Sequence, residues 1–122
     1  MKVSKVSILF LGLVSTVLCI SCIQQHPKII VHNTSNLDYD SIHVSTFEGE
    51  ITAFNDIKIN DRLEGVISFK NTKKGDGGYS LKVYTNDSII RQLHFGYYTN
   101  GSSLNSAFEV FIENDTIKVF EE

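Results

Sequence analysis

The chain has 122 residues, of which 42% are hydrophobic and 20% charged, and its eleven Lys and Arg against fourteen Asp and Glu give a net charge of -3. This length accommodates a single domain, and the hydrophobic content argues against a disordered chain. The lack of net positive charge argues against nucleic acid as a partner, because a phosphate backbone is bound through clustered Lys and Arg.

The first 25 residues differ in composition from the rest. Lys2 and Lys5 are the only charged residues among them, and a strongly apolar run follows over residues 6–20. A basic start before such a short run is typical of a secretory signal peptide, whereas a helix that spans a membrane needs about 20 apolar residues. We therefore expect a helical signal peptide over residues 1–21, with an uncleaved membrane anchor as the alternative.

Residues 18–22 read Leu-Cys-Ile-Ser-Cys. They resemble the lipobox of bacterial lipoproteins, in which a small residue such as Ser21 precedes the cysteine that receives the lipid. Cys19 stands where most lipoboxes have Leu, and in this respect the segment is similar to the looser lipoboxes of Bacteroidota. The resemblance implies that Cys22 becomes the lipidated first residue and that its acyl chains hold the protein on a membrane of the cell envelope. A plain signal peptide cleaved nearby is the alternative.

Residues 22–28 are expected to form a short polar tether between the lipidated cysteine and the domain. Surface-exported lipoproteins of Bacteroidota often carry acidic residues directly after the cysteine, and residues 23–26 contain none. This favours the periplasmic face of a membrane over the cell surface. The chain after residue 21 has nine basic and fourteen acidic residues, a formal charge of -5, and Cys22 as its one cysteine. Its stability is therefore expected to come from the core, without a disulfide.

From residue 28 onward, hydrophobic residues alternate with polar ones. A period of two is typical of half-buried strands, and strands of this kind bury their apolar faces when two sheets pack together. We expect an all-β domain over residues 29–122, an antiparallel β-sandwich of about seven or eight strands. The expected strands are residues 28–33, 41–47, 51–54, 57–60, 64–70, 78–85 and 89–97, followed by a hairpin over 106–120.

The hairpin is the most detailed of these expectations. Asn114 and Asp115 lie between two alternating runs, and both residue types tolerate the left-handed backbone that a tight turn needs. A turn at this position pairs Ile112 with Ile117 and places both on one face of the hairpin. The same register brings Phe111 and Phe120 together on the other face.

Residues 76–81 read Asp-Gly-Gly-Tyr-Ser-Leu. They resemble the segment that enters strand F of immunoglobulin-like domains, where a tyrosine lies two residues before a core position and its hydroxyl bonds back to the backbone. Tyr79 matches that tyrosine, and Leu81 stands where antibody domains have cysteine. The resemblance implies an immunoglobulin-like sandwich.

Three segments resemble the Asp-Ser/Thr-apolar acceptor of general O-glycosylation in Bacteroidota. They are residues 40–42, 87–89 and 115–117, with Ser41, Ser88 and Thr116 as the acceptors that the resemblance implies. The same pattern also follows from ordinary strand starts, since Asp closes a turn and Ser or Thr followed by Ile opens a strand. Both interpretations stay open.

Patterns typical of metal sites and catalytic sites are missing from the sequence. The four histidines lack the short spacings of zinc sites, and the alternating Asn36, Asp38 and Asp40 lack the glycine and distal glutamate of a calcium loop. The serines do not lie in a nucleophile motif, and the paired carboxylates lie in polar segments. We expect no metal, no cofactor and no enzymatic activity.

Residues 95–103 combine aromatic rings with a flexible, hydrogen-bonding loop. Tyr and Asn beside Gly are typical of sugar-binding and peptide-binding surfaces. Tyr98, Asn100 and the nearby Tyr84 are the candidate ligand-binding residues. The alternative is a strand that ends in a turn, with Tyr97 in the core and Tyr98 on the opposite face.

Together these features predict a lipid-anchored protein of the bacterial cell envelope. Its expected function is that of a non-catalytic binding or accessory module for a protein or glycan partner. The alternative is a periplasmic immunity or inhibitor protein that neutralises an enzyme or toxin through its acidic surface.

Overall fold

The computed structural model describes residues 26–122, and the regular secondary structure in this part of the chain is all β-strand. Among these residues, no helix is long and apolar enough to cross a membrane. The expected all-β class is confirmed. The nine strands are β1 (Lys28–Asn33), β2 (Tyr39–Thr46), β3 (Thr52–Ile57), β4 (Arg62–Val66), β5 (Gly77–Thr85), β6 (Ser88–Thr99), β7 (Ser102–Ser103), β8 (Ala107–Ile112) and β9 (Ile117–Glu121).

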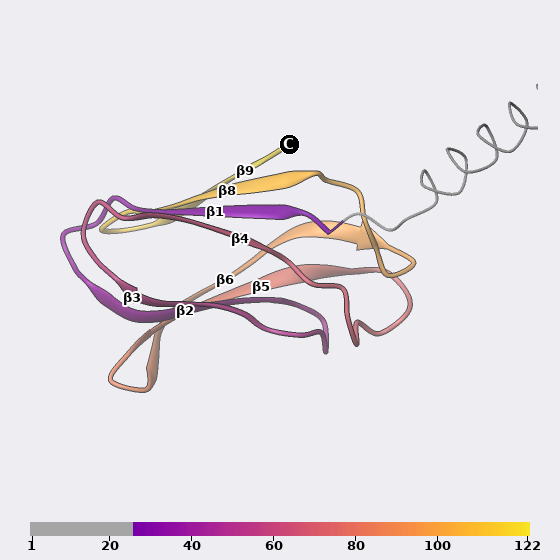
Figure 1. Cartoon of the computed structure of the whole chain (residues 1–122), viewed down its shortest axis with the longest axis horizontal. Helices are drawn as coiled ribbons and strands as arrows, with labels where there is room; N and C mark the ends of the chain where they lie inside the picture. Colours follow the sequence, from indigo (N-terminus) through magenta and orange to yellow (C-terminus); the bar gives the residue numbers. More distant parts are fainter. Residues whose placement is uncertain (1–25) are drawn as a thin grey trace, which may run out of the picture.

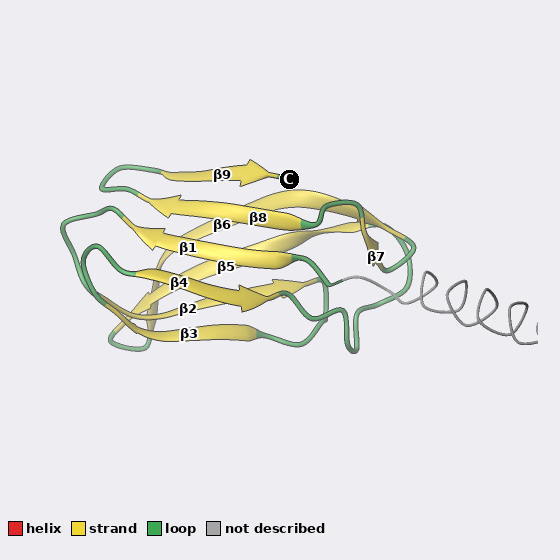
Figure 2. Ribbon diagram, turned by 45° about the horizontal axis from the view of Figure 1, so that its top comes forward, coloured by secondary structure: helices red, strands yellow, loops and turns green. Residues whose placement is uncertain are grey.

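Two sheets pack face to face, with strand orders β4-β1-β8-β9 and β3-β2-β5-β6-β7 (Figures 1 and 2). This is a β-sandwich, as the alternation predicted. The prediction that it is wholly antiparallel was wrong, because β1 and β8 pair in parallel. Both strands start at the same end of the sandwich, where the Lys28 amide donates to the Ser106 carbonyl at 2.9 Å, so they run in the same direction.

The two ends of the sandwich are named by where the described chain begins. Residues 26–28 join the sandwich at what we call the proximal end (Figure 1). The connecting segments at the proximal end, which we call its loops, are residues 47–51, 67–76 and 99–106. The last of these begins at the final residue of β6 and contains β7. The opposite, distal end holds the turns at residues 34–38, 58–61, 86–87 and 113–116.

The core lies between the sheets and follows the predicted alternation. Along β5, for example, Tyr79, Leu81 and Val83 are buried while the residues between them are half-buried and face outward. Burial of such side chains is the main driving force for folding, and each contributes about 1.5–3 kcal/mol. Within the described residues, the strands and the core residues lie between residues 28 and 121. The core residues are Ile29, Val31, Tyr39, Ile42, Val44, Phe54, Ile57, Ile67, Phe69, Tyr79, Leu81, Val83, Tyr98, Phe108, Val110 and Ile112.

Residues 57–60 do not form the strand that was expected of them. β3 continues to Ile57, and the chain then turns, because Asp56 (φ 57°) and Asn60 (φ 70°) adopt left-handed backbone conformations. The carboxylate of Asp61 closes this turn by accepting the Lys58 amide at 2.8 Å. Ile59, which the alternation assigned to a buried face, is exposed as a result.

The expected strand over residues 64–70 is shorter than predicted. β4 ends at Val66, although Ile67 and Phe69 are buried as the alternation required. Their backbone amides bond to the N-terminal segment instead of a strand partner: Ile67 to the Pro27 carbonyl at 2.8 Å and Phe69 to Nδ1 of His26 at 3.2 Å. Alternation therefore identified core residues correctly here, but not strand pairing.

The C-terminal hairpin has the predicted register. Ile112 pairs with Ile117, and Phe111 packs edge to face on Phe120 with ring centroids 5.7 Å apart. The conformation of the turn differs from the expected one, because Asn114 and Asp115 do not adopt left-handed backbone conformations. The turn is closed by the Glu113 amide, which donates to the Thr116 carbonyl at 2.9 Å. A left-handed Asn-Asp pair occurs instead at Asn86 (φ 53°) and Asp87 (φ 61°), which join β5 to β6.

Candidate functional site

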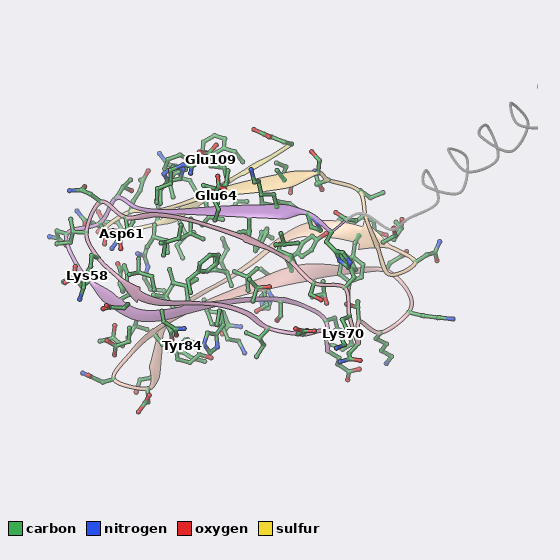
Figure 3. The ribbon with its side chains drawn as sticks, in the orientation of Figure 1. Lys58, Asp61, Glu64, Lys70, Tyr84 and Glu109 are labelled. Carbon is green, nitrogen blue, oxygen red and sulfur yellow. The ribbon has the colours of Figure 1, made fainter. Side chains whose placement is uncertain are left out.

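The outer face of the five-stranded sheet carries an open hollow of about 830 Å³. It lies over β2, β5 and β6, toward the proximal end, on the side of the sandwich to which Tyr84 points in Figure 3. Side chains that could contact a ligand come from three strands and two loops. They include Phe47, Asp76, Ser80, Lys82, Gln92 and His94, and we call this site the outer-face hollow.

The hollow exists because its floor has almost no side chains. Gly78 and Ser80 of β5 lie next to Ser45 of β2 and Gly96 of β6. A Cβ atom on Gly78 would lie 3.0 Å from the Gly96 carbonyl oxygen, so the close approach of β5 and β6 leaves little room for a side chain. The register shift between Gly77 and Tyr79 bends the strand at this point, as bulges commonly do.

A carboxylate is held in place at the rim of the hollow. The Tyr97 hydroxyl donates to Asp76 Oδ2 at 2.9 Å, and the Asn100 amide donates to Asp76 Oδ1 at 3.2 Å. The bond to the carboxylate raises the pKa of Tyr97 above its ordinary value, because the hydroxyl proton is held by Asp76. Asn100 reaches this position with a left-handed backbone (φ 50°). The Asp76 carboxylate is thus held in place at the rim by these two bonds.

The wall of the hollow carries polar groups aligned by strand pairing. Lys82 pairs with Gln92, and Ser80 pairs with His94, so an ammonium, an amide, a hydroxyl and an imidazole face the same side of the sheet. Gln92 Nε2 and His94 Nε2 are 3.4 Å apart, and both side chains are exposed. This set of donors and acceptors suits a polar ligand that binds through several hydrogen bonds. In residues 26–122, no cluster of three or more His, Cys, Asp or Glu is arranged to hold a metal ion.

Tyr98, one of the predicted ligand-binding residues, lies in the core. It is 1% exposed, packs edge to face on Phe69 and Tyr79, and its hydroxyl accepts the Phe47 amide at 3.3 Å. Gly96 (φ 65°) interrupts the alternation along β6, so Tyr98 turns inward and Tyr97, which was expected inside, is 50% exposed. In this structure, Tyr97 rather than Tyr98 is available at the surface.

The other two predicted residues lie apart from each other. Tyr84 is half-buried on the outer face of the sheet and packs against His43 with ring centroids 4.6 Å apart, beyond the edge of the outer-face hollow. Asn100 lies in the proximal loop and contributes its backbone amide to Asp76, as described above. Sequence reasoning missed Asp76, Lys82, Gln92 and His94. The one sequence signal of Lys82, Gln92 and His94 is that they occupy polar positions of alternating strands, which many surface residues share, and Asp76 lies in a loop.

Of the modification sites expected from the sequence, Cys22 lies outside the described residues. Ser88, the first residue of β6, and Thr116, in the turn 113–116, are exposed at the distal end. Ser41 is half-buried within β2, which pairs with a strand on each side. An enzyme that transfers a sugar must reach the hydroxyl and the flanking backbone, which is easier at a turn than inside a sheet. Ser88 and Thr116 are therefore accessible to such an enzyme, and Ser41 is much less so.

We predict that Ser88 and Thr116 carry any O-linked glycan and that Ser41 does not. Peptides that span the three positions, taken from protein made in its native host and analysed by mass spectrometry, test this directly. Modification at Ser41 would contradict the prediction. If all three residues were unmodified, the Asp-Ser/Thr-Ile segments would serve only as strand starts.

Comparison with known proteins supports the fold and does not assign a family. No family model matches the chain, and no curated protein matches it. An NMR structure of a protein from Eubacterium rectale is similar over 80% of this chain and 88% of that one, with 15% identity and a TM-score of 0.50. A structure of pneumolysin matches 81% of this chain and 24% of its own, with 7% identity and a TM-score of 0.38. The first similarity concerns the fold alone.

Proposed function

We propose that this protein is a non-catalytic binding module of the bacterial cell envelope, anchored by a lipid on Cys22, and that the outer-face hollow binds a glycan. The observation that carries the proposal is the hollow itself: a small-residue floor surrounded by fixed and exposed hydrogen-bonding groups from three strands. Sugars present many hydroxyls on a flat ring, and an open site with several donors and acceptors is suited to them. Phe47 at the rim offers a ring for apolar contact with a sugar face.

We also propose that the sandwich is immunoglobulin-like. Two observations support this: the chain crosses repeatedly between the sheets, and Tyr79 lies near the start of β5, two residues before the buried Leu81. The Tyr79 hydroxyl donates to Ser103 Oγ at 3.1 Å, where immunoglobulin-like domains use a backbone acceptor. Burial raises the pKa of Tyr79 and the bond to Ser103 opposes that effect. The parallel pairing of β1 with β8 is a further difference from that fold.

An immunity or inhibitor role is the second candidate, and the acidic distal end favours it. Asp38, Asp40, Asp56 and Asp87 are all exposed there. Lys58 Nζ lies 2.8 Å from Asp56 and 4.0 Å from Asp38, and these carboxylates raise the pKa of Lys58. The lysine neutralises part of the acidic surface. A basic toxin or enzyme that binds this end, with the outer-face hollow left free, would support this alternative.

Titration of the ¹⁵N-labelled domain with members of a glycan array tests the glycan proposal. A glycan that binds is expected to shift the amide resonances of β5 and β6 around Lys82 and Gln92. We expect Lys82→Ala and Gln92→Ala each to weaken binding about tenfold, the effect of losing one well-formed hydrogen bond. Lys118→Ala is the matched control, because Lys118 lies on β9 in the other sheet and is exposed.

Two results would contradict glycan binding in the outer-face hollow. Resonance shifts confined to the distal turns, or equal effects of Lys82→Ala and Lys118→Ala, would contradict binding in the hollow. If no glycan binds while a protein copurifies stoichiometrically from the native host, the proposed partner of the binding module is that protein and not a glycan.

A further inference from the structure

We infer that the proximal end of the sandwich contacts the bilayer itself, so that the domain stands on the membrane surface instead of floating at the end of a tether. This inference rests on the proposed lipid anchor at Cys22 and adds a second contact, made by the folded domain. The partner that we propose for this surface is a lipid bilayer.

The N-terminal segment is attached to the proximal loops by backbone hydrogen bonds. The Pro27 carbonyl accepts the Ile67 amide at 2.8 Å, and the Lys28 amide donates to the Ser106 carbonyl at 2.9 Å. His26 Nδ1 accepts the Phe69 amide at 3.2 Å. The position of residues 26–28 is thus fixed between the loops 67–76 and 99–106, and the chain leaves the domain through this surface.

The covalent reach from Cys22 to His26 is short. Four residue steps span at most about 14 Å when fully extended. The longest strand, β6, has 12 residues, which corresponds to about 40 Å. An anchor at Cys22 therefore keeps the proximal end within about 14 Å of the bilayer surface, whereas the distal end can lie about 40 Å farther away.

The proximal loops form one continuous surface. The Glu50 amide donates to the Lys70 carbonyl at 3.1 Å, and the Gly101 amide donates to the Gly75 carbonyl at 2.9 Å. Figure 3 places Lys70 at this end of the molecule, with Lys58 and Asp61 at the other. Backbone hydrogen bonds therefore join the three loops into one face.

Large apolar side chains protrude from this face. Leu104 is 62% exposed, and Ile51 is 56% exposed. Val66 at the same end is 54% exposed. Apolar side chains that protrude from loops gain free energy when they enter the interface between headgroups and acyl chains.

Charge plays a smaller part in this contact. Lys70, Lys73 and Lys74 are exposed and within reach of lipid phosphates, but the same loops carry Glu48, Glu50 and Asp76. The formal charges of the three loops cancel, and Glu121 and Glu122 end the chain nearby. We therefore expect contact with zwitterionic lipid and only a weak dependence on salt.

The distal end supplies matched controls for a test. Leu37, 58% exposed in the turn 34–38, matches Leu104, and Ile59, 44% exposed in the turn 58–61, matches Ile51. All four side chains lie outside the core, and residues 26–122 contain no cysteine. A single cysteine at each position accepts a fluorescent label, because an acylated Cys22 has no free thiol.

The experiment uses the full-length protein, extracted from its native host, labelled at one position and reconstituted into phosphatidylcholine vesicles that contain a brominated lipid as quencher. The labels on Leu104→Cys and Ile51→Cys are expected to lose at least half of their fluorescence, and those on Leu37→Cys and Ile59→Cys less than one tenth. The mass of each sample reports whether Cys22 carries acyl chains.

The outcomes separate the inference from the proposed anchor. Equal quenching at both ends, or quenching at neither end in a sample whose Cys22 is acylated, would overturn the bilayer contact and leave the anchor intact. An unacylated Cys22 would refute the anchor. Its free thiol would then take the label as well, so the four variants are compared in a Cys22→Ser background. Quenching at Leu104 and Ile51 alone would still support an apolar membrane face, and its absence would refute that face too.

Discussion

Gly96→Ala is expected to lower the free energy of unfolding by about 3 kcal/mol, which makes it one of the two most damaging substitutions we foresee. Gly96 has a φ of 65°, in the left-handed region that L side chains avoid. A Cβ atom there would lie 2.8 Å from Cδ2 of Tyr79 and 3.1 Å from Cε1 of Phe108, both buried rings. The added methyl group must displace this aromatic packing or move β6.

Gly101→Ala is the matched control for this prediction. Gly101 has nearly the same φ, 68°, but a Cβ atom there would have nothing within 4 Å. Its cost is expected to be that of the backbone conformation, about 1 kcal/mol. Urea unfolding followed by circular dichroism measures both variants. Equal losses at the two glycines would contradict the role of the rings around Gly96.

Asn33→Ala is expected to cost a similar amount, about 3 kcal/mol, for a different reason. Asn33 is fully buried at the end of β1. Its amide group donates to the carbonyls of Leu37 at 2.8 Å and Lys58 at 3.1 Å, and its Oδ1 accepts the Ser35 amide and hydroxyl. Alanine removes four bonds and leaves buried backbone groups without these partners.

The neighbouring Asn36→Ala is the control, because the Asn36 side chain is exposed and the bond from its backbone amide to Asn114 remains. We expect a change within about 0.5 kcal/mol. A loss at Asn33 as small as that at Asn36, measured by urea unfolding, would show that Asn33 does not connect the turns 34–38 and 58–61 in the way described.

The strands were largely predictable from the sequence because alternation is a local signal. Residues two apart on a strand face the same side, so Tyr79, Leu81 and Val83 identify a buried face without knowledge of the partner strand. The register of the C-terminal hairpin was predictable for the same reason, since its two strands are adjacent in the sequence. The parallel pairing of β1 with β8 was not, because residues 28 and 107 meet only in the folded chain.

Failures of the alternation occur where the backbone leaves the extended conformation. Asp56 and Asn60 adopt left-handed conformations that turn residues 58–61 away from a strand. Gly96 also adopts a left-handed conformation, within β6. As a result, Tyr98 lies in the core and Tyr97 lies at the surface. Asn, Asp and Gly all tolerate such conformations, but they also occur in regular positions, so the residue type alone does not locate the break.

The candidate site was less predictable than the fold. Residues 95–103 lie beside the hollow, since Tyr97 and Asn100 both bond to Asp76, and their role in binding stays a prediction. The hollow itself depends on the pairing of Lys82 with Gln92 and on the glycine floor, which are properties of three strands brought together. A ligand-binding surface on a sheet is a non-local feature, and a single sequence holds little information about it.

The mass of the N-terminal peptide of the mature protein, purified in mild detergent from native-host membranes, tests the central claim most directly. An anchored envelope protein predicts a chain that begins at Cys22 and carries the added mass of acyl chains, together with recovery in the membrane fraction. A chain that begins elsewhere, or an unmodified Cys22 in a protein free of the membrane, would contradict the lipid anchor and leave the binding module without its proposed location.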